Sequence, residues 1–299
     1  MESKKVRNRG IVVKFYSNLL VVEDIDNGNR VLCKLRGKFK KQGIRPITGD
    51  LVEYTYVVNN EGVVENILNR TTELKKPSVA NVDQVVIVTT IEKPEVPLDI
   101  LDRFIILVEN EGLPIVIVLN KIDLLNEERI NHFESIYGKL YPIVKTSALK
   151  NVGIENLKEH LKNKISVFAG MSGVGKSSLL NAIESNLKLR TGEISEKLGR
   201  GKHTTTAAEL LRLSFGGWVV DTPGFASLEI DGIPLNKLRE LFIEFPSDMC
   251  YFPDCLHIDE PGCYVKEMVS KGKISNSRYE SYQKFLKEIE ELERSHNEK

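Results

Sequence analysis

Hydrophobic and polar residues alternate in short runs over the first seventy positions, a pattern typical of β-strands. Turn-forming Asn, Asp and Gly residues separate the runs. The strands are predicted at residues 11–16, 19–22, 30–35, 51–57 and 63–67. Five short strands in so small a segment favour a closed β-barrel of the OB-fold type.

From residue 82 to residue 221 the pattern changes to buried Val- and Ile-rich runs that alternate with amphipathic segments. The preceding segment, 70–77, is predicted as a linker. Strands are expected at 82–88, 114–119, 142–146, 165–169, 209–215 and 218–221, and helices at 98–110, 127–139, 154–162 and after residue 177. Continuous apolar strands between helices predict a mainly parallel sheet with helices on both faces.

The last seventy residues predict an α-helical module with a short helix at 235–242 and a charged helix at 276–294. Tyr279, Tyr282, Phe285, Ile289 and Leu292 form the apolar face of the second helix. Its opposite face offers the four-residue pairs Glu280/Lys284, Lys284/Glu288 and Glu290/Arg294. We therefore divide this multidomain α/β chain into residues 1–70, 71–228 and 229–299.

Charged residues are unevenly distributed along the chain. The 299 residues carry no net charge, with 42 basic and 42 acidic side chains, yet positions 1–45 hold twelve Lys and Arg against four acids. No signal peptide and no run of about 18 apolar residues is present, so we expect a cytoplasmic protein. The barrel domain is therefore basic.

A glycine-rich sequence, Gly170-Met-Ser-Gly-Val-Gly-Lys-Ser177, lies between a predicted strand and a predicted helix. This is the phosphate-binding loop motif in its required context. Glycines let successive backbone N–H groups surround phosphate oxygens, and the helix N-terminus adds its positive dipole. Lys176 is expected to reach the β- and γ-phosphates, and Ser177 to ligate Mg²⁺.

Two further motifs identify the base. Asn120-Lys-Ile-Asp123 follows a predicted strand, and Thr146-Ser-Ala148 follows the next. A carboxylate at position 123 can accept hydrogen bonds from guanine N1–H and its exocyclic amine, a donor pair that adenine lacks. Lys121 is expected to pack along the base, Asn120 to join the base loop to the phosphate loop, and the Ala148 N–H to meet guanine O6.

Asp221-Thr-Pro-Gly224 ends a later strand and is expected to hold Mg²⁺ and sense the γ-phosphate. The full set of residues expected to bind GTP is Asn120, Lys121, Ile122, Asp123, Ser147, Ala148, Gly170, Met171, Ser172, Gly173, Val174, Gly175, Lys176, Ser177, Ser178, Asp221 and Gly224.

The order of these motifs is unusual. GTPases ordinarily run from the phosphate loop through D-x-x-G to N-K-x-D, whereas here N-K-x-D precedes the phosphate loop. The sequence therefore predicts a circularly permuted GTPase domain, which requires only that the original termini lie close together. The chain leaves this domain directly after the D-x-x-G motif. Switch II, the segment at that motif, is therefore connected directly to the C-terminal module.

Switch I is placed between residues 186 and 209, around Gly199-Arg-Gly-Lys-His-Thr-Thr-Thr206. Thr205, or otherwise Thr204, is predicted to close over Mg²⁺, with Ser177 and Asp221 as its other ligands. Phe225 occupies the position where many GTPases carry a water-orienting glutamine, which predicts slow intrinsic hydrolysis. His203 is the candidate substitute, and Lys176 and Thr205 complete the catalytic set.

Three of the four cysteines fall in the pattern Cys250-x₄-Cys255-x-His257-x₅-Cys263. Three thiolates and one imidazole make a closed tetrahedral donor set, which favours one structural Zn²⁺ ion over a catalytic metal. The alternative is unligated cysteines. Cys33 is predicted to lie in the barrel core.

The segment 36–45 is basic, contains two glycines and has no acid. On an OB-like scaffold it is predicted to be a loop that follows phosphates, with Phe39 able to stack on a base. The RNA-binding candidates are Arg36, Lys38, Phe39, Lys40, Lys41 and Arg45. The alternative is a solvated basic loop.

The barrel, the permuted motifs and the Cys/His spacing together resemble the ribosome small-subunit-dependent GTPase A family, RsgA, over nearly the whole chain. The resemblance implies a late assembly factor of the small (30S) ribosomal subunit that binds 16S rRNA. It also implies GTP hydrolysis that the subunit stimulates and that releases the factor. GTP or GDP, Mg²⁺ and one Zn²⁺ are the implied cofactors; we expect a monomer that binds neither membranes nor DNA.

Two other functions are compatible with the residues alone. Phe225 favours a nucleotide-gated RNA-binding protein without turnover. A GTPase acting on tRNA or on membranes is a weaker option, because the sequence has no lipid anchor and no basic amphipathic helix.

Overall fold

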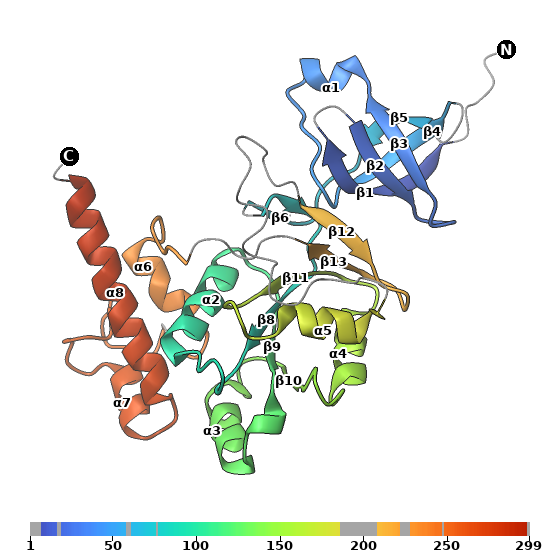
Figure 1. Cartoon of the computed structure of the whole chain (residues 1–299). Helices are drawn as coiled ribbons and strands as arrows, with labels where there is room; N and C mark the ends of the chain where they lie inside the picture. The colour runs from blue at the N-terminus through green and yellow to red at the C-terminus, as the bar shows by residue number, and fades with distance from the viewer. Residues whose placement is uncertain are drawn as a thin grey trace. The chain divides into compact units, whose positions relative to one another are not determined.

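The structure is a computed structural model of the whole chain (Figure 1). It describes residues 7–16, 19–57, 61–75, 77–185, 208–221, 228–246 and 248–297, with the backbone alone at Lys40, Asp221 and residues 296–297. Two compact units are distinguished: Met1–Val85 with Glu155–Phe168 and Ser177–Ala226, and Val86–Ile154 with Ala169–Lys176 and Ser227–Lys299.

The N-terminal segment forms the predicted closed barrel. Its strands are β1 (Asn8–Tyr16), β2 (Leu19–Asp24), β3 (Arg30–Leu35), β4 (Leu51–Tyr56) and β5 (Glu61–Ile67). The order is β1-β2-β3-β5-β4, with β1 returning to β4 and with β3 parallel to β5. Alternate side chains point inward, as the alternating sequence requires, and Cys33 is fully buried among them as predicted.

The basic segment between β3 and β4 contains a short helix, α1 (Gly37–Lys41), where a loop was expected. Phe39 is only 4% exposed and belongs to the barrel core, which also contains Val31 and Leu20. The prediction that Phe39 stacks on a nucleic-acid base is therefore wrong, because its ring is part of the apolar interior.

The central sheet has six strands in the order β10-β9-β8-β11-β13-β12. They are β8 (Gln84–Thr89), β9 (Ile115–Leu119), β10 (Ile143–Lys145), β11 (Ile165–Ala169), β12 (Glu209–Arg212) and β13 (Trp218–Asp221). The pairs β9/β10 and β11/β13 are parallel and β12/β13 is antiparallel, so the predicted mainly parallel sheet is confirmed. Its helices are α2 (Leu98–Asn110), α3 (Glu127–Tyr137), α4 (Ile154–Leu161) and α5 (Lys176–Ile183).

Residues 70–77, expected to be a linker, take part in a small two-stranded sheet of β6 (Glu73–Leu74) and β7 (Val79–Ala80). In the same unit, β12 lies against the barrel. The Thr48 hydroxyl donates to the Ala208 carbonyl at 2.7 Å, and Arg212 pairs with Glu23 at 3.0 Å. The barrel is therefore attached to the strand that follows the predicted switch I segment.

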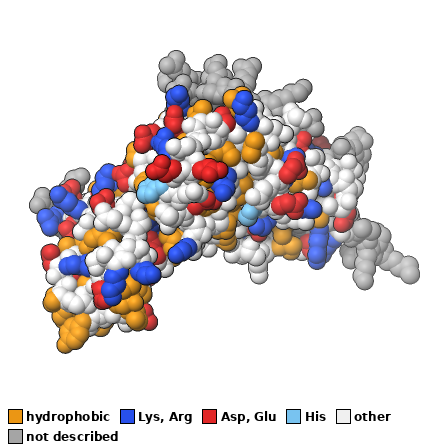
Figure 2. All heavy atoms as spheres, turned by 90° about the horizontal axis from the view of Figure 1, so that it is seen from below, with side chains coloured by type: hydrophobic (Ala, Val, Ile, Leu, Met, Phe, Trp, Pro, Cys, Tyr) orange, Lys and Arg blue, Asp and Glu red, His pale blue; other side chains and the backbone are white. Residues whose placement is uncertain are grey.

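The C-terminal module contains α6 (Leu235–Leu238), the 3₁₀ turn η3 (Arg239–Leu241), α7 (Tyr264–Ser270) and α8 (Asn276–Asn297). Helix α7 was not predicted. Tyr282, Phe285 and Ile289 of α8 are buried as its apolar face required, against Phe242 and Phe245. Figure 2 shows hydrophobic side chains gathered on the surface at the side where the C-terminal helices lie in Figure 1. Within the described residues, every helix is too short or too polar to cross a lipid bilayer.

Candidate nucleotide site and zinc cluster

The predicted phosphate loop follows β11, whose five residues are all buried, and ends where α5 begins at Lys176. Gly170 has a φ of 133°, and a Cβ there would lie 2.2 Å from the Val88 carbonyl oxygen. Gly175 has a φ of 98°, and its Cβ would lie 2.4 Å from Asn120 Nδ2. Side chains at these two positions would collide with the β8 backbone and with the Asn120 side chain, so both glycines are required by space as well as by conformation.

Lys176 is folded back over the loop. Its ammonium group donates to the carbonyl oxygens of Gly170 and Met171, both at 2.7 Å. Burial lowers the pKa of Lys176 to about 8, because the loop offers no negative charge to offset the lost hydration. The phosphates of a nucleotide would supply that charge.

Asn120 joins the base loop to the phosphate loop, as predicted from the sequence. Its buried side chain donates from Nδ2 to the Val174 carbonyl at 2.9 Å, and its Oδ1 accepts from the Thr146 hydroxyl at 3.1 Å. The Asn120 amide group therefore connects its own loop to the phosphate loop and to the loop that begins at Thr146.

Lys121 adds a second connection that the sequence did not indicate. The residue has a left-handed backbone (φ 59°), and its ammonium group donates to the carbonyls of Gly173, at 2.8 Å, and Lys93. Its stem thereby bridges the N-K-x-D segment and the phosphate loop, the span over which a base would lie.

Asp123 lies on the short 3₁₀ turn η1 (Ile122–Leu124) and is exposed, with one carboxylate oxygen accepting from the buried Ser147 hydroxyl. The Ala148 N–H, expected to face guanine O6, donates to Asn120 Oδ1 at 3.3 Å. The two loops expected to read the base are therefore in contact.

The remaining predicted phosphate-loop residues have two surroundings. Met171 and Ser172 are exposed, whereas Val174 is fully buried. Ser177 and Ser178 lie in the first turn of α5, half-buried. This exposed turn at a helix N-terminus is the geometry that binds phosphate groups.

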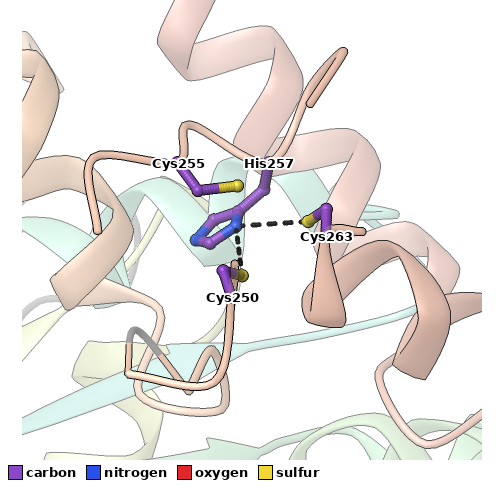
Figure 3. A group of neighbouring side chains, drawn as sticks. All are labelled: Cys250, Cys255, His257 and Cys263. Carbon is purple, nitrogen blue, oxygen red and sulfur yellow. Dashed lines mark hydrogen bonds between the residues drawn. The ribbon is translucent and has the colours of Figure 1, made fainter. Parts of the chain in front are cut away.

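The four predicted zinc ligands come together in the C-terminal module (Figure 3). Their donor atoms all lie within 4.8 Å of one another. His257 Nδ1 lies 3.5 Å from the Cys250 sulfur and 3.4 Å from the Cys263 sulfur. A tetrahedral Zn²⁺ ion with Zn–S bonds of about 2.3 Å needs donors roughly this close, so the residues fit the metal.

The surroundings of the cluster favour metal binding. Burial lowers the pKa of His257, which keeps the imidazole neutral. It also raises the pKa of the Cys255 thiol to about 12, which a bound metal ion would reverse by stabilising the thiolate. The Tyr282 hydroxyl donates to the Leu256 carbonyl at 2.7 Å, and Arg239 donates to the Cys255 carbonyl at 3.0 Å, so the ligand-bearing backbone is held in place.

Comparisons with known proteins identify the family of this chain. A family model described as RsgA GTPase matches residues 65–231, and one described as RsgA N-terminal domain matches residues 9–64. The chain belongs to the RsgA GTPase family. It is accordingly a GTPase, and membership of this family implies guanine nucleotide and Mg²⁺ as its ligands.

Relatives and solved structures support the assignment over the full length. The "Small ribosomal subunit biogenesis GTPase RsgA" of Thermotoga petrophila is 55% identical over 287 residues, covering 95% of this chain and 97% of the relative. The crystal structure of YjeQ from Thermotoga maritima has a TM-score of 0.85 at 52% identity, covering 95% of this chain and 99% of that one. The structure of "YloQ, a circularly permuted GTPase" has a TM-score of 0.82 at 32% identity and covers 98% of both chains. The predicted permutation is thereby confirmed.

Several predicted residues of this RsgA-family site lie outside the described residues. They are His203, Thr204, Thr205, Gly224 and Phe225. Asp221 is the last residue of β13, where its backbone alone is described. Their roles stay predictions.

The basic segment of the barrel presents four described basic side chains to solvent: Arg36, Lys38, Lys41 and Arg45. Arg36 pairs with Glu65 at 2.5 Å, and Lys38 contacts Asn66 at 3.4 Å. Lys41 and Arg45 are the more available for phosphate, because no acidic partner is recorded for either among the described residues.

Sequence reasoning missed a buried arginine that joins α8 to α2. Arg278 donates to Asp102 at 2.8 Å and to both carboxylate oxygens of Glu244, at 2.7 and 3.1 Å. Its guanidinium lies 4.6 Å from the centre of the Phe242 ring. A positive residue at the start of an amphipathic helix gave no sign of burial, because its acidic partners are distant in sequence.

Proposed function

We propose that this RsgA-family GTPase is a late-stage assembly and maturation factor of the small (30S) ribosomal subunit. Subunit binding stimulates its GTP hydrolysis, and hydrolysis releases it from the particle. The observation that carries the proposal is the 55% identity, over 95% of the chain, to a relative named for small ribosomal subunit biogenesis. The basic surface of the barrel supports an RNA-containing target, because phosphate attraction requires clustered Lys and Arg side chains.

The nucleotide would be bound as follows. Asp123 reads the guanine edge, the Ser147–Ala148 turn covers its O6 side, and Lys121 packs along the ring. The backbone of residues 170–178 surrounds the phosphates, and Lys176 exchanges its two carbonyl partners for phosphate oxygens. The joined loops favour this arrangement because they are already ordered relative to one another.

Mg²⁺ would be held by Ser177, Asp221 and Thr205, and Gly224 would sense the γ-phosphate. His203 is proposed to orient the attacking water in place of the glutamine that Phe225 replaces. Mg²⁺ supplies charge neutralisation at the transferring phosphate, and Lys176 adds the positive charge that this chain itself contributes.

One structural Zn²⁺ ion would be held by Cys250, Cys255, His257 and Cys263. We also propose that the chain acts as a monomer in the cytoplasm, with domains at residues 1–70, 71–228 and 229–299. Contacts to 16S rRNA are assigned to Arg36, Lys38, Lys40, Lys41 and Arg45.

The decisive assay is phosphate release from GTP by the purified protein alone, with small subunits and with large subunits. We expect slow release alone and strong stimulation by small subunits only. Equal stimulation by both subunits, or by neither, would contradict the proposed target.

The rRNA contacts are tested by changing Lys38, Lys40, Lys41 and Arg45 together to alanine. Small-subunit affinity should fall, and its dependence on salt should flatten, because each lost phosphate contact removes roughly 0.7–0.9 from the logarithmic salt slope. A control that changes the exposed residues Lys75, Lys139, Lys150 and Lys162 removes the same charge from other surfaces. Equal losses in both variants would show a non-specific charge effect.

The base-reading assignment is tested by Asp123→Asn, which replaces an acceptor pair by an amide. GTP affinity should fall and xanthosine triphosphate affinity should rise, because xanthine presents a carbonyl where guanine has an amine. Glu128→Gln, an exposed change nearby on α3, should alter neither. Retained GTP affinity in Asp123→Asn would exclude Asp123 as the residue that reads the base.

A further inference from the structure

The zinc loop, residues 248–263, exposes large apolar side chains. Tyr251 is 80% exposed, Met249 is 54% exposed and Phe252 is 37% exposed. The Tyr251 and Phe252 rings contact edge to face, with centroids 4.9 Å apart. A cluster of exposed aromatic and Met side chains is characteristic of a surface that binds another molecule.

These side chains stand on an anchored backbone. Met249 directly precedes Cys250 of the zinc cluster, and Tyr251 and Phe252 lie between Cys250 and Cys255. The Cys255 carbonyl accepts a hydrogen bond from Arg239. On the other side of Tyr251 is Gly262, whose Cβ position would lie 3.7 Å from the Tyr251 Cβ. An anchored backbone lowers the ordering cost of binding through such side chains.

The zinc loop itself is acidic, although Arg239 and Lys266, from the flanking segments, donate to its Cys255 and Ile258 carbonyls. Residues 243–262 contain five acids and no Lys or Arg. Glu244 pairs with Arg278, and Glu260 accepts the Ile258 backbone N–H at 2.9 Å. The other three, Asp248, Asp254 and Asp259, are exposed. Three thiolates with one Zn²⁺ would add a further net charge of −1.

This charge excludes one class of partner. RNA phosphates are repelled by a surface with three exposed carboxylates, whereas a Lys- or Arg-rich protein segment is attracted. Arg and Lys side chains can also lie over the Tyr251 ring while they pair with the carboxylates. The basic α1 segment of the barrel has the opposite character and suits RNA.

We propose that the zinc loop is a docking surface for a basic segment of a protein, with Tyr251 and Met249 as the apolar contacts and Asp248, Asp254 and Asp259 as the charged ones. The proposal rests on the proposed function, because the partner would be a protein component of the small-subunit particle. It assigns protein contact to the C-terminal module and RNA contact to the barrel.

The test compares the full-length protein with two variants, Met249→Ser/Tyr251→Ser and Asp248→Asn/Asp254→Asn/Asp259→Asn. Binding is measured to three probes: purified small subunits, protein-free RNA from those subunits, and polylysine. Each variant should bind small subunits and polylysine at least tenfold more weakly than wild type, and protein-free RNA with unchanged affinity. Zinc content, measured for every variant, should stay at the wild-type value.

The outcomes are separable. Wild-type affinity of both variants for small subunits would overturn the docking surface while leaving the proposed function intact. Weaker binding of the Met249→Ser/Tyr251→Ser variant to protein-free RNA would show that the partner is RNA. If wild-type protein did not bind small subunits, the proposed function would fail, and the polylysine measurement would still decide whether the loop binds basic chains.

Discussion

The barrel and the C-terminal module are stabilised by different means. Each barrel strand pairs with two neighbours in a closed sheet, around a core in which Val12, Val22 and Phe39 are buried. The C-terminal module has one long helix, α8, and short helices joined by loops, and its polar contacts include the Cys/His cluster and the buried Arg278. In a closed sheet the backbone N–H and C=O groups form hydrogen bonds with neighbouring strands. In loops, side chains or bound ligands must supply those partners.

The surfaces of the two modules also differ, in this case in the charge of their exposed side chains. The barrel exposes basic side chains at 36–45, and the zinc loop exposes acidic and aromatic ones. The two modules therefore offer surfaces of opposite charge. The three largest expected effects each concern one of these two modules.

The largest expected effect is loss of the metal. Structural zinc contributes on the order of 10 kcal/mol of binding free energy in small zinc domains, so a chelator or Cys255→Ser should unfold the C-terminal module. Hydrogen exchange should rise over residues 248–263 and stay unchanged in β1 to β5. Cys33→Ser is the matched control, because that buried cysteine lies in the barrel. Retained protection of the zinc loop without metal would show that the module does not depend on zinc.

The next effect is expected at Arg278, which is fully buried. Although burial alone would lower the pKa of Arg278, the charges of Asp102 and Glu244 hold it well above its ordinary value, so the side chain stays charged. Arg278→Met leaves those carboxylates without their partner and should lower the free energy of unfolding by about 3–5 kcal/mol.

Arg294 serves as the control on the same helix. It is exposed and lies 3.9 Å from Glu290, so Arg294→Ala should change the free energy of unfolding by less than about 1 kcal/mol. Denaturant unfolding of both variants checks the difference. Equal stability of the two would mean that the buried network contributes nothing.

A smaller effect is expected inside the barrel. Phe39→Ala removes a buried ring and should cost about 3 kcal/mol, whereas the neighbouring exposed Lys38→Ala should cost less than about 0.5 kcal/mol. Under conditions where both variants are folded, Lys38→Ala should lower RNA affinity more than Phe39→Ala does. A large loss of RNA affinity in a folded Phe39→Ala protein would restore the base-stacking interpretation.

The smallest effect concerns pH and belongs to neither module. With the pKa of Lys176 near 8, its ammonium loses its proton above pH 8 in the nucleotide-free protein, and phosphate should restore the proton. GTP binding at pH 8.5 should therefore take up protons, and affinity should fall as pH rises from 8. Titration calorimetry in buffers of different ionisation enthalpy measures the uptake. Lys176→Arg, which stays charged, should show none.

The same pKa predicts how stability varies with pH. Because the folded-state pKa of Lys176 lies below the unfolded value, the nucleotide-free protein should gain stability as pH rises from about 8 toward 10.5. A thermal melt of the Lys176→Met variant should lack this contribution.

Helix α8 shows which contacts the hydrophobic periodicity of the sequence can predict. The pattern placed Tyr282, Phe285 and Ile289 on the buried face, which the structure confirms. Of the predicted surface pairs, Glu290/Arg294 is present, but Lys284 pairs with Asp99 and Glu288 with Arg103, both on α2. A charged side chain on α8 can pair with a residue one turn away on the same helix or with a residue on another helix. Sequence spacing reveals only the partner on the same helix.

The nucleotide site and the zinc cluster were predictable to a similar extent. Spacing selected Asn120, Asp123, Lys176 and the four Cys/His residues as candidates, because phosphate loops, base loops and chelates use residues close together in the chain. The contact of Lys121 with the carbonyls of Gly173 and Lys93 was not predictable, because those acceptors are backbone groups whose positions depend on the folded loops.

The amino-acid sequence by itself determined the strands of the barrel, the permuted order of the GTPase motifs and the donor set of the zinc cluster, since each is a local pattern. Tertiary structure alone decided that Phe39 is buried, that Arg278 lies between two distant carboxylates and that the zinc loop exposes Tyr251. Burial and charge pairing depend on which distant segments pack together, and no local pattern records that choice.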